Sequence, residues 1–151
     1  EHNGKVVLSA INIPFTKETY YAEKKGGAFL NDKILRINKP TKNRMIAIGG
    51  FPKRYQKRIV DTFDIMGKTL FSDFRLLGSA MVAMCFVAKG VLDAYIDIGA
   101  KPWDIAPVLI VEEAGGRVTD INGNEWSSYQ MDYVISNGKI HDEILKILKG
   151  R

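Results

Sequence analysis

The sequence predicts an α+β / α/β fold, in which N-terminal antiparallel hairpins are followed by a mixed sheet with flanking helices. Residues 1–40 alternate short apolar runs with turn residues, a pattern typical of antiparallel strands. The composition changes at residues 40–43, where proline and polar residues predict a loop. From residue 45 onward, predicted strands and helices alternate, which favours a sheet with helices on its faces. We therefore expect a hairpin segment at 1–40 and an α/β domain at 41–151.

The hairpin segment begins with two predicted strands, at residues 6–12 and 19–23, joined by a turn around Pro14. Asn31 and Asp32 then separate two shorter apolar runs. Both residue types tolerate the positive φ that a two-residue hairpin requires, so they predict a second tight turn. The segment carries no recognisable catalytic constellation.

The α/β part is predicted from hydrophobic periodicity and from residues that start or stop helices. Ser79 is a natural N-cap for an apolar helix that runs to residue 88, and Gly115 and Gly116 are suited to end the helix that follows Asp104. The single cysteine, Cys85, lies in an apolar stretch and is expected to pack in the core. The remaining expected strands are at 45–48, 73–77, 94–98, 117–120 and 133–135, and the remaining helices at 53–66 and 140–149.

The length and charge of the chain indicate one domain and disfavour nucleic-acid binding. A chain of 151 residues is long enough for one domain with a sizeable core. Its net charge is +5, but the basic residues are scattered and no zinc spacing or RNA-binding aromatic motif accompanies them. A solvated basic surface is therefore favoured over nucleic-acid binding, which stays a third hypothesis. The sequence has no apolar run of eighteen residues and no signal-peptide pattern, so we expect no membrane association and a cytoplasmic location.

Two carboxylates in the stretch 94–116 are the first candidates for a site. Asp97 ends a predicted strand, and Asp104 lies where the next helix is expected to begin. The Asp104 carboxylate can cap the first N–H groups of that helix, or it can point past the helix end at a ligand or metal. The structural alternative is an N-cap together with an exposed strand-end acid. Gly78 and Ser79 offer a similar choice between a capped core helix and a backbone that a phosphate or hydroxyl approaches.

The segments Trp103-Asp104-Ile105-Ala106 and Glu113-Ala114-Gly115-Gly116 resemble the C-terminal signature of the inositol monophosphatase family. Matches at 26–31, 78–80 and 88–95 keep the family's order and spacing. The resemblance implies a Mg²⁺-dependent phosphatase in which Asp104 is a metal ligand and Asp97 contacts a substrate hydroxyl. It also implies a substrate pocket lined by Gly78, Ser79 and Ala80, with Gly50 on the sugar side.

The resemblance implies the C-terminal half of an enzyme that hydrolyses inositol or sugar monophosphates, or fructose 1,6-bisphosphate, by metal-activated water. Two motifs of the family's first half are absent, a Gly-Glu-Glu-type metal ligand and an Asp-Pro-(Leu/Ile)-Asp-Gly-Thr segment. We therefore expect the chain alone to be inactive or nearly so, since one carboxylate cannot organise a Mg²⁺ site. A fragment, a truncated gene product and one piece of a split enzyme all remain open.

The alternative is a non-catalytic structural or interaction module that retains the fold without the full metal site. The hairpin sheet is expected to have an exposed edge, which favours pairing with a missing N-terminal half or self-association, for example as a dimer. Lys101 lies close enough to Asp104 to contact a second phosphate, but a solvated loop lysine is the favoured interpretation.

Overall fold

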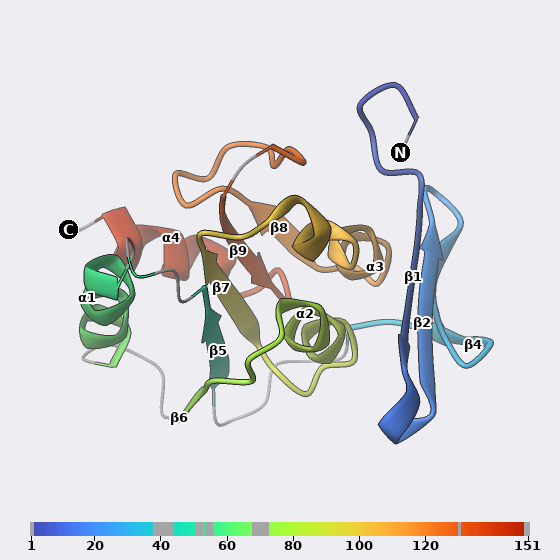
Figure 1. Cartoon of the computed structure of the whole chain (residues 1–151), viewed down its shortest axis with the longest axis horizontal. Coiled ribbons are helices and arrows are strands. Elements are labelled where there is room, and N and C mark those ends of the chain that lie inside the picture. The colour runs from blue at the N-terminus through green and yellow to red at the C-terminus, as the bar shows by residue number, and fades with distance from the viewer. Residues whose placement is uncertain are drawn as a thin grey trace.

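The computed structural model describes residues 2–37, 44–50, 53, 56–67, 73–129 and 131–149. They form four layers: an antiparallel sheet, a pair of helices, a mixed sheet and a second pair of helices (Figure 1). The predicted fold class is therefore confirmed. The predicted boundary near residue 40 lies outside the described residues, so the division into segments 1–40 and 41–151 stays a prediction.

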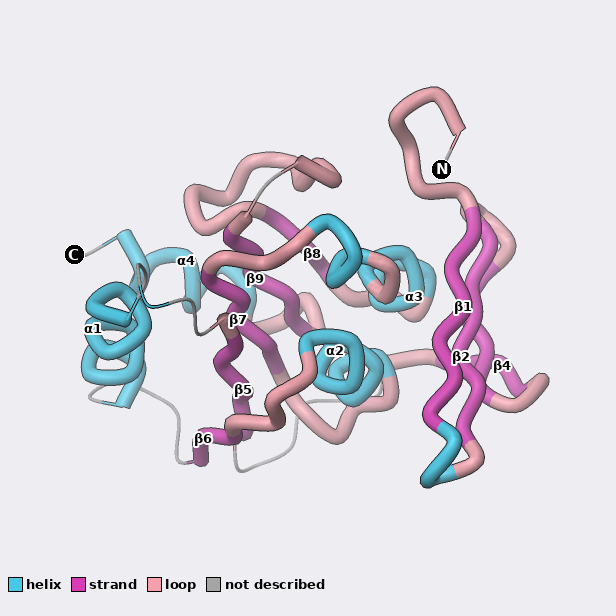
Figure 2. Tube along the Cα trace, in the orientation of Figure 1, coloured by secondary structure: helices cyan, strands magenta, loops and turns pink. Residues whose placement is uncertain are grey.

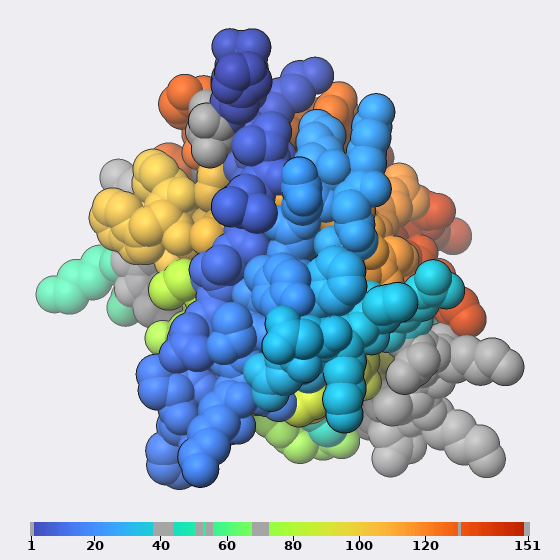
Figure 3. Space-filling model, turned by 90° about the vertical axis from the view of Figure 1, so that its right-hand side faces the viewer, coloured from blue at the N-terminus to red at the C-terminus, as the bar shows by residue number. Residues whose placement is uncertain are grey.

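The first layer is a four-stranded sheet in which every neighbouring pair is antiparallel, with the order β1-β2-β3-β4. Its strands are β1 (Leu8–Ile13), β2 (Glu18–Glu23), β3 (Gly27–Leu30) and β4 (Lys33–Leu35). Asn31 and Asp32 join β3 to β4 with φ angles of 47° and 62°, which confirms the predicted two-residue turn. Figure 3 views the molecule from this side, with the sheet facing the reader.

The third layer is a five-stranded sheet with the order β6-β5-β7-β9-β8. Its strands are β5 (Met45–Gly49), β6 (Asp73–Arg75), β7 (Ala94–Ile98), β8 (Arg117–Thr119) and β9 (Asp132–Ser136). β5 runs parallel to β6 and β7, whereas β9 is antiparallel to β7 and β8, so the sheet is mixed. Every residue of β7 is buried, because helices cover both faces of this central strand (Figure 2).

The helices fill the two remaining layers. α2 (Ala80–Ala88) and α3 (Val108–Glu113) pack between the sheets, and α1 (Gln56–Gly67) and α4 (His141–Lys149) cover the outer face of the mixed sheet. Cys85 of α2 is fully buried, and burial raises the pKa of its thiol to about 12, which suits packing rather than chemistry. Within the described residues, no helix has the length and apolar character needed to cross a bilayer.

Glu113, at the end of α3, ties the helix layer to the antiparallel sheet. Its Oε1 accepts a hydrogen bond from the Lys25 backbone N–H at 2.7 Å, and its Oε2 accepts one from the Gly27 N–H at 3.0 Å. The Ile37 N–H donates to the carbonyl of Ala114 at 2.9 Å. These bonds satisfy backbone groups at the β2–β3 turn and at the end of α3, and they hold the first sheet against the rest of the molecule.

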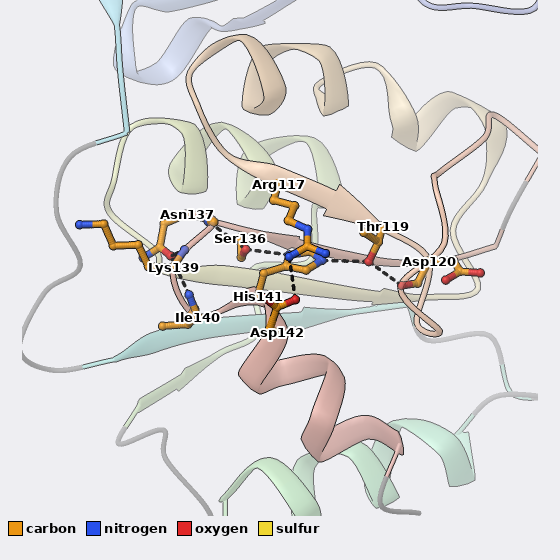
Figure 4. A network of polar contacts seen from close by, with 10 residues as sticks. Arg117, Thr119, Asp120, Ser136, Asn137, Lys139, Ile140, His141 and Asp142 are labelled. Carbon is orange, nitrogen blue, oxygen red and sulfur yellow. Dashed lines mark hydrogen bonds and ion pairs between the residues drawn. The ribbon is translucent and has the colours of Figure 1, made fainter.

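His141 is fully buried at the start of α4 and belongs to a network that bridges β8 and β9 (Figure 4). The Thr119 hydroxyl donates to the Asp120 carbonyl at 2.7 Å, so it accepts the hydrogen bond that joins it to Nε2 of His141 at 2.9 Å. Nδ1 is then unprotonated and accepts from the Ser136 hydroxyl at 2.8 Å. Burial, aided by the positive charge of Arg117, lowers the pKa of His141 to about 4.

Because the pKa of buried His141 is lowered, we expect the free energy of unfolding to depend on pH. Between pH 6.5 and about 4, the unfolded chain binds a proton at His141 and the native chain does not. As the pH is lowered across that interval, the free energy of unfolding should therefore fall by about 3 kcal/mol from this group alone. Above pH 6.5 this group should have no further effect on the free energy of unfolding. Urea unfolding of the wild type and of His141→Gln, compared at several pH values, isolates the contribution. Equal pH dependence in both proteins would contradict it.

Candidate functional site

A pocket of about 340 Å³ opens at the carboxyl ends of β5 and β7, beside the N-terminus of α2. Ligands in α/β sheets commonly bind outside the carboxyl ends of parallel strands. The residues singled out from the sequence come from four separate parts of the chain, and all of them line this pocket. They are Gly50, Gly78, Ser79, Ala80, Asp97 and Asp104.

The N-terminus of α2 forms one wall. Ser79 is extended, with a φ of −144°, and its hydroxyl accepts the Val82 N–H at 3.4 Å, so it is the predicted N-cap. Gly78 precedes it with a φ of 69°, and a Cβ placed there would meet no atom within 4 Å. The glycine is therefore required for its backbone conformation, and the space beside it is open. Capping and proximity to the pocket coexist at this helix end.

Two glycines at the end of β5 allow the chain to pass close to β7. A Cβ on Gly49 would lie 1.9 Å from the Tyr95 hydroxyl, and a Cβ on Gly50 would lie 1.7 Å from the carbonyl oxygen of Ile98. Gly50 also has a φ of 82°. Gly50 therefore excludes any side chain, which is a structural requirement in addition to its place in the pocket wall, whereas a side chain at Gly49 would displace the Tyr95 ring.

Asp97 is buried, with only 2% of its surface exposed, so the alternative of an exposed strand-end acid is wrong. Alternation along β7 turns Asp97 and Tyr95 toward α2, on the face opposite Ile96. Burial raises the pKa of the Asp97 carboxyl to about 7, with the charges of Asp104 and Asp132 adding to the shift and the Tyr95 hydroxyl opposing it.

The Oδ2 atom of Asp97 is buried and has no hydrogen-bond partner among the described residues. A buried carboxylate oxygen without a partner is costly, and such atoms are uncommon in folded proteins. Since Asp97 also lines the pocket, a hydroxyl group of a bound molecule is well suited to supply the missing donor.

Asp104 lies in a short 3₁₀ turn, η3 (Pro102–Ile105), and not at the start of α3 as the sequence had suggested. Pro107 immediately precedes α3, which begins at Val108. Because proline has no N–H to donate, it separates the turn from the helix. The Asp104 Oδ2 accepts the Lys101 N–H at 2.8 Å, and the Asp104 N–H donates to the Lys101 carbonyl at 2.8 Å.

The turn between the two carboxylates is held from behind. The N–H groups of Gly99 and Ala100 both donate to the Met131 carbonyl at 2.7 Å, and the Gly99 N–H also contacts Oδ1 of Asp132 at 3.1 Å. The other oxygen of Asp132 pairs with Arg58 of α1 at 2.7 Å. This support was not predicted, because it joins residues distant in sequence that carry no local signal.

Tyr95 and Lys101 are also part of the pocket and were not among the predicted site residues. The period of two along a strand offered a signal for Tyr95, because it precedes Asp97 by two residues and so shares its face. The sequence had suggested that Lys101 could contact a second phosphate, although a solvated loop lysine was the favoured interpretation. It is half-buried and lines the pocket, and in sequence it lies between the two carboxylates.

The carboxylate of Asp104 is suited to supply one of the ligands of a magnesium ion. Carboxylate oxygens are the ligands that Mg²⁺ prefers, and no hydrogen bond to the Oδ1 atom of Asp104 is found in the described part of the chain. Across residues 2–37, 44–50, 53, 56–67, 73–129 and 131–149, however, no group of three or more His, Cys, Asp or Glu side chains is arranged to hold a metal. Asp104 can therefore contribute one ligand, and further ligands must complete the shell.

Comparison with known proteins identifies the family to which the chain belongs. The model of the inositol monophosphatase family matches residues 1–150. A Thermotoga maritima protein named fructose-1,6-bisphosphatase/inositol-1-monophosphatase is 34% identical over 97% of this chain and 56% of its own length. A Neisseria meningitidis protein named putative Nus factor SuhB is 35% identical over 99% of this chain and 59% of its own length.

Solved structures show the same fold. An IMPase from Thermotoga maritima superposes with a TM-score of 0.86 at 32% identity, covering 98% of this chain and 57% of that one. The extragenic suppressor protein suhB from Bartonella henselae gives a TM-score of 0.90 at 28% identity, covering 99% of this chain and 58% of that one. The chain thus spans between half and two thirds of the length of these relatives. With a family model matched over residues 1–150, the chain belongs to the inositol monophosphatase family.

Proposed function

We propose that this chain forms the alcohol-binding wall and one metal ligand of a Mg²⁺-dependent phosphatase acting on inositol or sugar phosphates. The convergence of the predicted residues on a single pocket supports this function most directly, together with the buried carboxylate oxygen of Asp97 that has no partner among the described residues. The Thermotoga maritima relative is named for hydrolysis of such esters. A cytoplasmic location is part of the same proposal.

Each group in the pocket has a distinct task. Asp97, when ionised, accepts a hydrogen bond from a ring hydroxyl and so orients the alcohol part of the substrate. Gly78 and Ala80 present backbone without bulky side chains beside that ring. Asp104 provides a carboxylate oxygen to Mg²⁺, which when bound lowers the pKa of a water molecule and neutralises charge on the phosphate.

One carboxylate gives little affinity for Mg²⁺, so the chain alone is expected to have little activity. The remaining ligands and the groups around the reacting phosphate must come from polypeptide other than the described residues. Activity is therefore expected only where polypeptide that supplies these groups is present.

A non-catalytic interaction module is the second candidate. The Neisseria meningitidis relative, at 35% identity, is named as a putative Nus factor rather than as a phosphatase. In this alternative the fold and part of the pocket remain while the metal site is not used. The two candidates differ in whether phosphate release requires Asp104.

The outer face of the antiparallel sheet has the apolar character of a surface that binds another protein. Across three strands, Tyr21 stacks on Phe29 with ring centroids 5.1 Å apart, and Phe29 is directly opposite Ile34, which is 69% exposed. This apolar row lies in a sheet whose outer strands, β1 and β4, pair with no further strand among the described residues. We propose that a second copy of the chain or further polypeptide of the family fold covers it.

Replacing Asp104 tests the catalytic proposal. In the complete gene product with Mg²⁺, Asp104→Asn should lower kcat/KM for inositol 1-phosphate and fructose 1,6-bisphosphate by about 100-fold or more, because a metal ligand loses its charge. Phosphate release is the measurement. Asp61→Asn, on the exposed side of α1, is the matched control and should keep full activity. Unchanged activity in Asp104→Asn would refute the assignment, and a wild type without activity would favour the interaction module.

The Asp97→Asn substitution should stabilise the fold and weaken substrate binding. The variant removes the cost of burying a charge, so the free energy of unfolding at pH 8 should rise by about 1–3 kcal/mol. Because the native pKa of Asp97 is raised to about 7, this gain should shrink as the pH falls from 7 toward 4, where native wild type is protonated. KM should rise by about 10-fold or more as the hydroxyl acceptor loses its charge. Urea unfolding and steady-state kinetics measure the two effects; a destabilised variant with normal KM would contradict both.

Self-association is tested on the apolar row. Light scattering of this chain over a wide concentration range should show a concentration-dependent rise above monomer mass. Ile34→Glu should suppress it, because a charge on the sheet face opposes burial. Val60→Glu, an equally apolar and exposed position (64%) on α1, should leave it unchanged. A sharp monomeric profile at every concentration would rule out this form of the proposal.

A further inference from the structure

We infer that Arg58 and Asp132 are positioning residues for the proposed phosphatase reaction, although neither is among the described residues that line the pocket. Arg58 of α1 binds the carboxylate of Asp132, and Asp132 binds the turn at residues 99–101, which forms part of the pocket wall. The pair also determines how much negative charge acts on Asp97. The inference rests on the proposed function, because it gives the pair a role in the binding of the alcohol part of the substrate.

The side chain of Asp132 connects α1 to the pocket wall. Asp132 is the first residue of β9 and lies opposite Ile98, the last residue of β7. Its Oδ2 accepts a hydrogen bond from Nη2 of Arg58 at 2.7 Å, and its Oδ1 accepts one from the Gly99 N–H at 3.1 Å. Because Gly99 lines the pocket, one carboxylate joins the helix on the outer face of the sheet to the wall of the site.

Main-chain hydrogen bonds continue from Gly99 to the proposed metal ligand. The N–H groups of Gly99 and Ala100 both donate to the Met131 carbonyl at 2.7 Å. The N–H of the next residue, Lys101, donates to the Asp104 carboxylate at 2.8 Å. Gly99 has a φ of 82°, a conformation that few other residues adopt, so long-range bonds determine where this turn lies. We therefore expect a displacement of Gly99 to move the pocket wall.

The charge of Asp132 also acts on Asp97, because it adds to the effect of burial in raising the pKa of the Asp97 carboxyl. Arg58 lies against Asp132 and offsets part of that negative charge, so it favours the ionised form of Asp97 that is proposed to accept a substrate hydroxyl. The residues that β5 and α2 contribute to the pocket are uncharged. The ionisable groups that act on Asp97 or share its surroundings are Tyr95 of the same strand, Lys101 and Asp104 of the following turns, and Asp132 and Tyr133 of β9.

Substitutions in the two partners should have different effects on substrate binding. In the complete gene product, assayed with Mg²⁺ and inositol 1-phosphate at pH 6.5, Arg58→Met leaves the charge of Asp132 uncompensated. KM should therefore rise by about 3- to 10-fold, while kcat stays within about 2-fold. Asp132→Asn removes the charge but keeps an acceptor for the Gly99 N–H, so KM should not rise. Arg58→Lys restores a cation and should recover most of the wild-type KM.

Carbon-13 NMR of the side-chain carboxyl carbons provides a measurement that does not depend on turnover. The Asp97 signal of the metal-free protein is assigned by its loss in Asp97→Asn. It should titrate at higher pH in Arg58→Met and at lower pH in Asp132→Asn, by about 0.5 pH unit in each direction. If Arg58→Met does not fold, the shift in Asp132→Asn decides the point, and an unchanged or higher titration there would overturn the inference.

Arg44 provides the matched control, because it pairs with Glu143 at 2.8 Å and is not among the described residues that line the pocket. Its side chain is 33% exposed, against 36% for Arg58. Arg44→Met should change neither KM nor the titration of Asp97. The same result in Arg58→Met, or shifts in one direction in both Arg58→Met and Asp132→Asn, would overturn the inference. Failure of the proposed function looks different, because wild type would release no phosphate while the opposite NMR shifts persist.

Discussion

The removal of the Asp97 carboxylate from water is the constraint on which the site depends. The residue is the last but one of β7, the central strand, which is buried on both faces, so its charge is opposed by the same packing that stabilises the fold. The result is a raised pKa and an oxygen without a partner. Strained or destabilised groups of this kind are commonly retained where a ligand supplies the missing interaction. Asp97 and His141 also respond to acid in opposite directions, since protonation relieves the first and disrupts the second.

Close backbone approach gives the pocket its shape. Gly50 lies against the backbone of Ile98 at a distance that no side chain allows, Gly49 leaves space for the Tyr95 hydroxyl, and the turn after β7 is anchored to Met131 and Asp132. The walls are therefore main chain and short side chains held by many bonds, and they are pre-formed rather than built on ligand binding. An organised wall of this type reduces the entropy lost when a polyol binds, because few protein groups must be ordered.

Local signals in the sequence were sufficient for much of this architecture. The turn at Asn31 and Asp32, the cap at Ser79 and the central strand all depend on neighbouring residues, and each was predicted. The burial of Asp97 was not, because it results from helices that pack on β7 from elsewhere in the chain. Asp104 was expected at a helix start, yet Pro107 intervenes and the residue occupies a separate turn. The family motif brought the site residues together; long-range packing determined what surrounds each of them.

The two halves of the site differ in how closely they are tied to folding. The proposed alcohol-binding wall is made from α2, β5 and β7, whose apolar residues form the core, so a chain that folds necessarily builds it. Asp104 lies in a short turn, its carboxylate accepts one backbone hydrogen bond, and the metal proposed to bind there would need ligands from outside the described residues. Substitution there leaves the core intact. The fold with its pocket can therefore persist without catalysis, whereas metal binding cannot persist without the fold, and this asymmetry is why both an enzyme and an interaction module are compatible with one architecture.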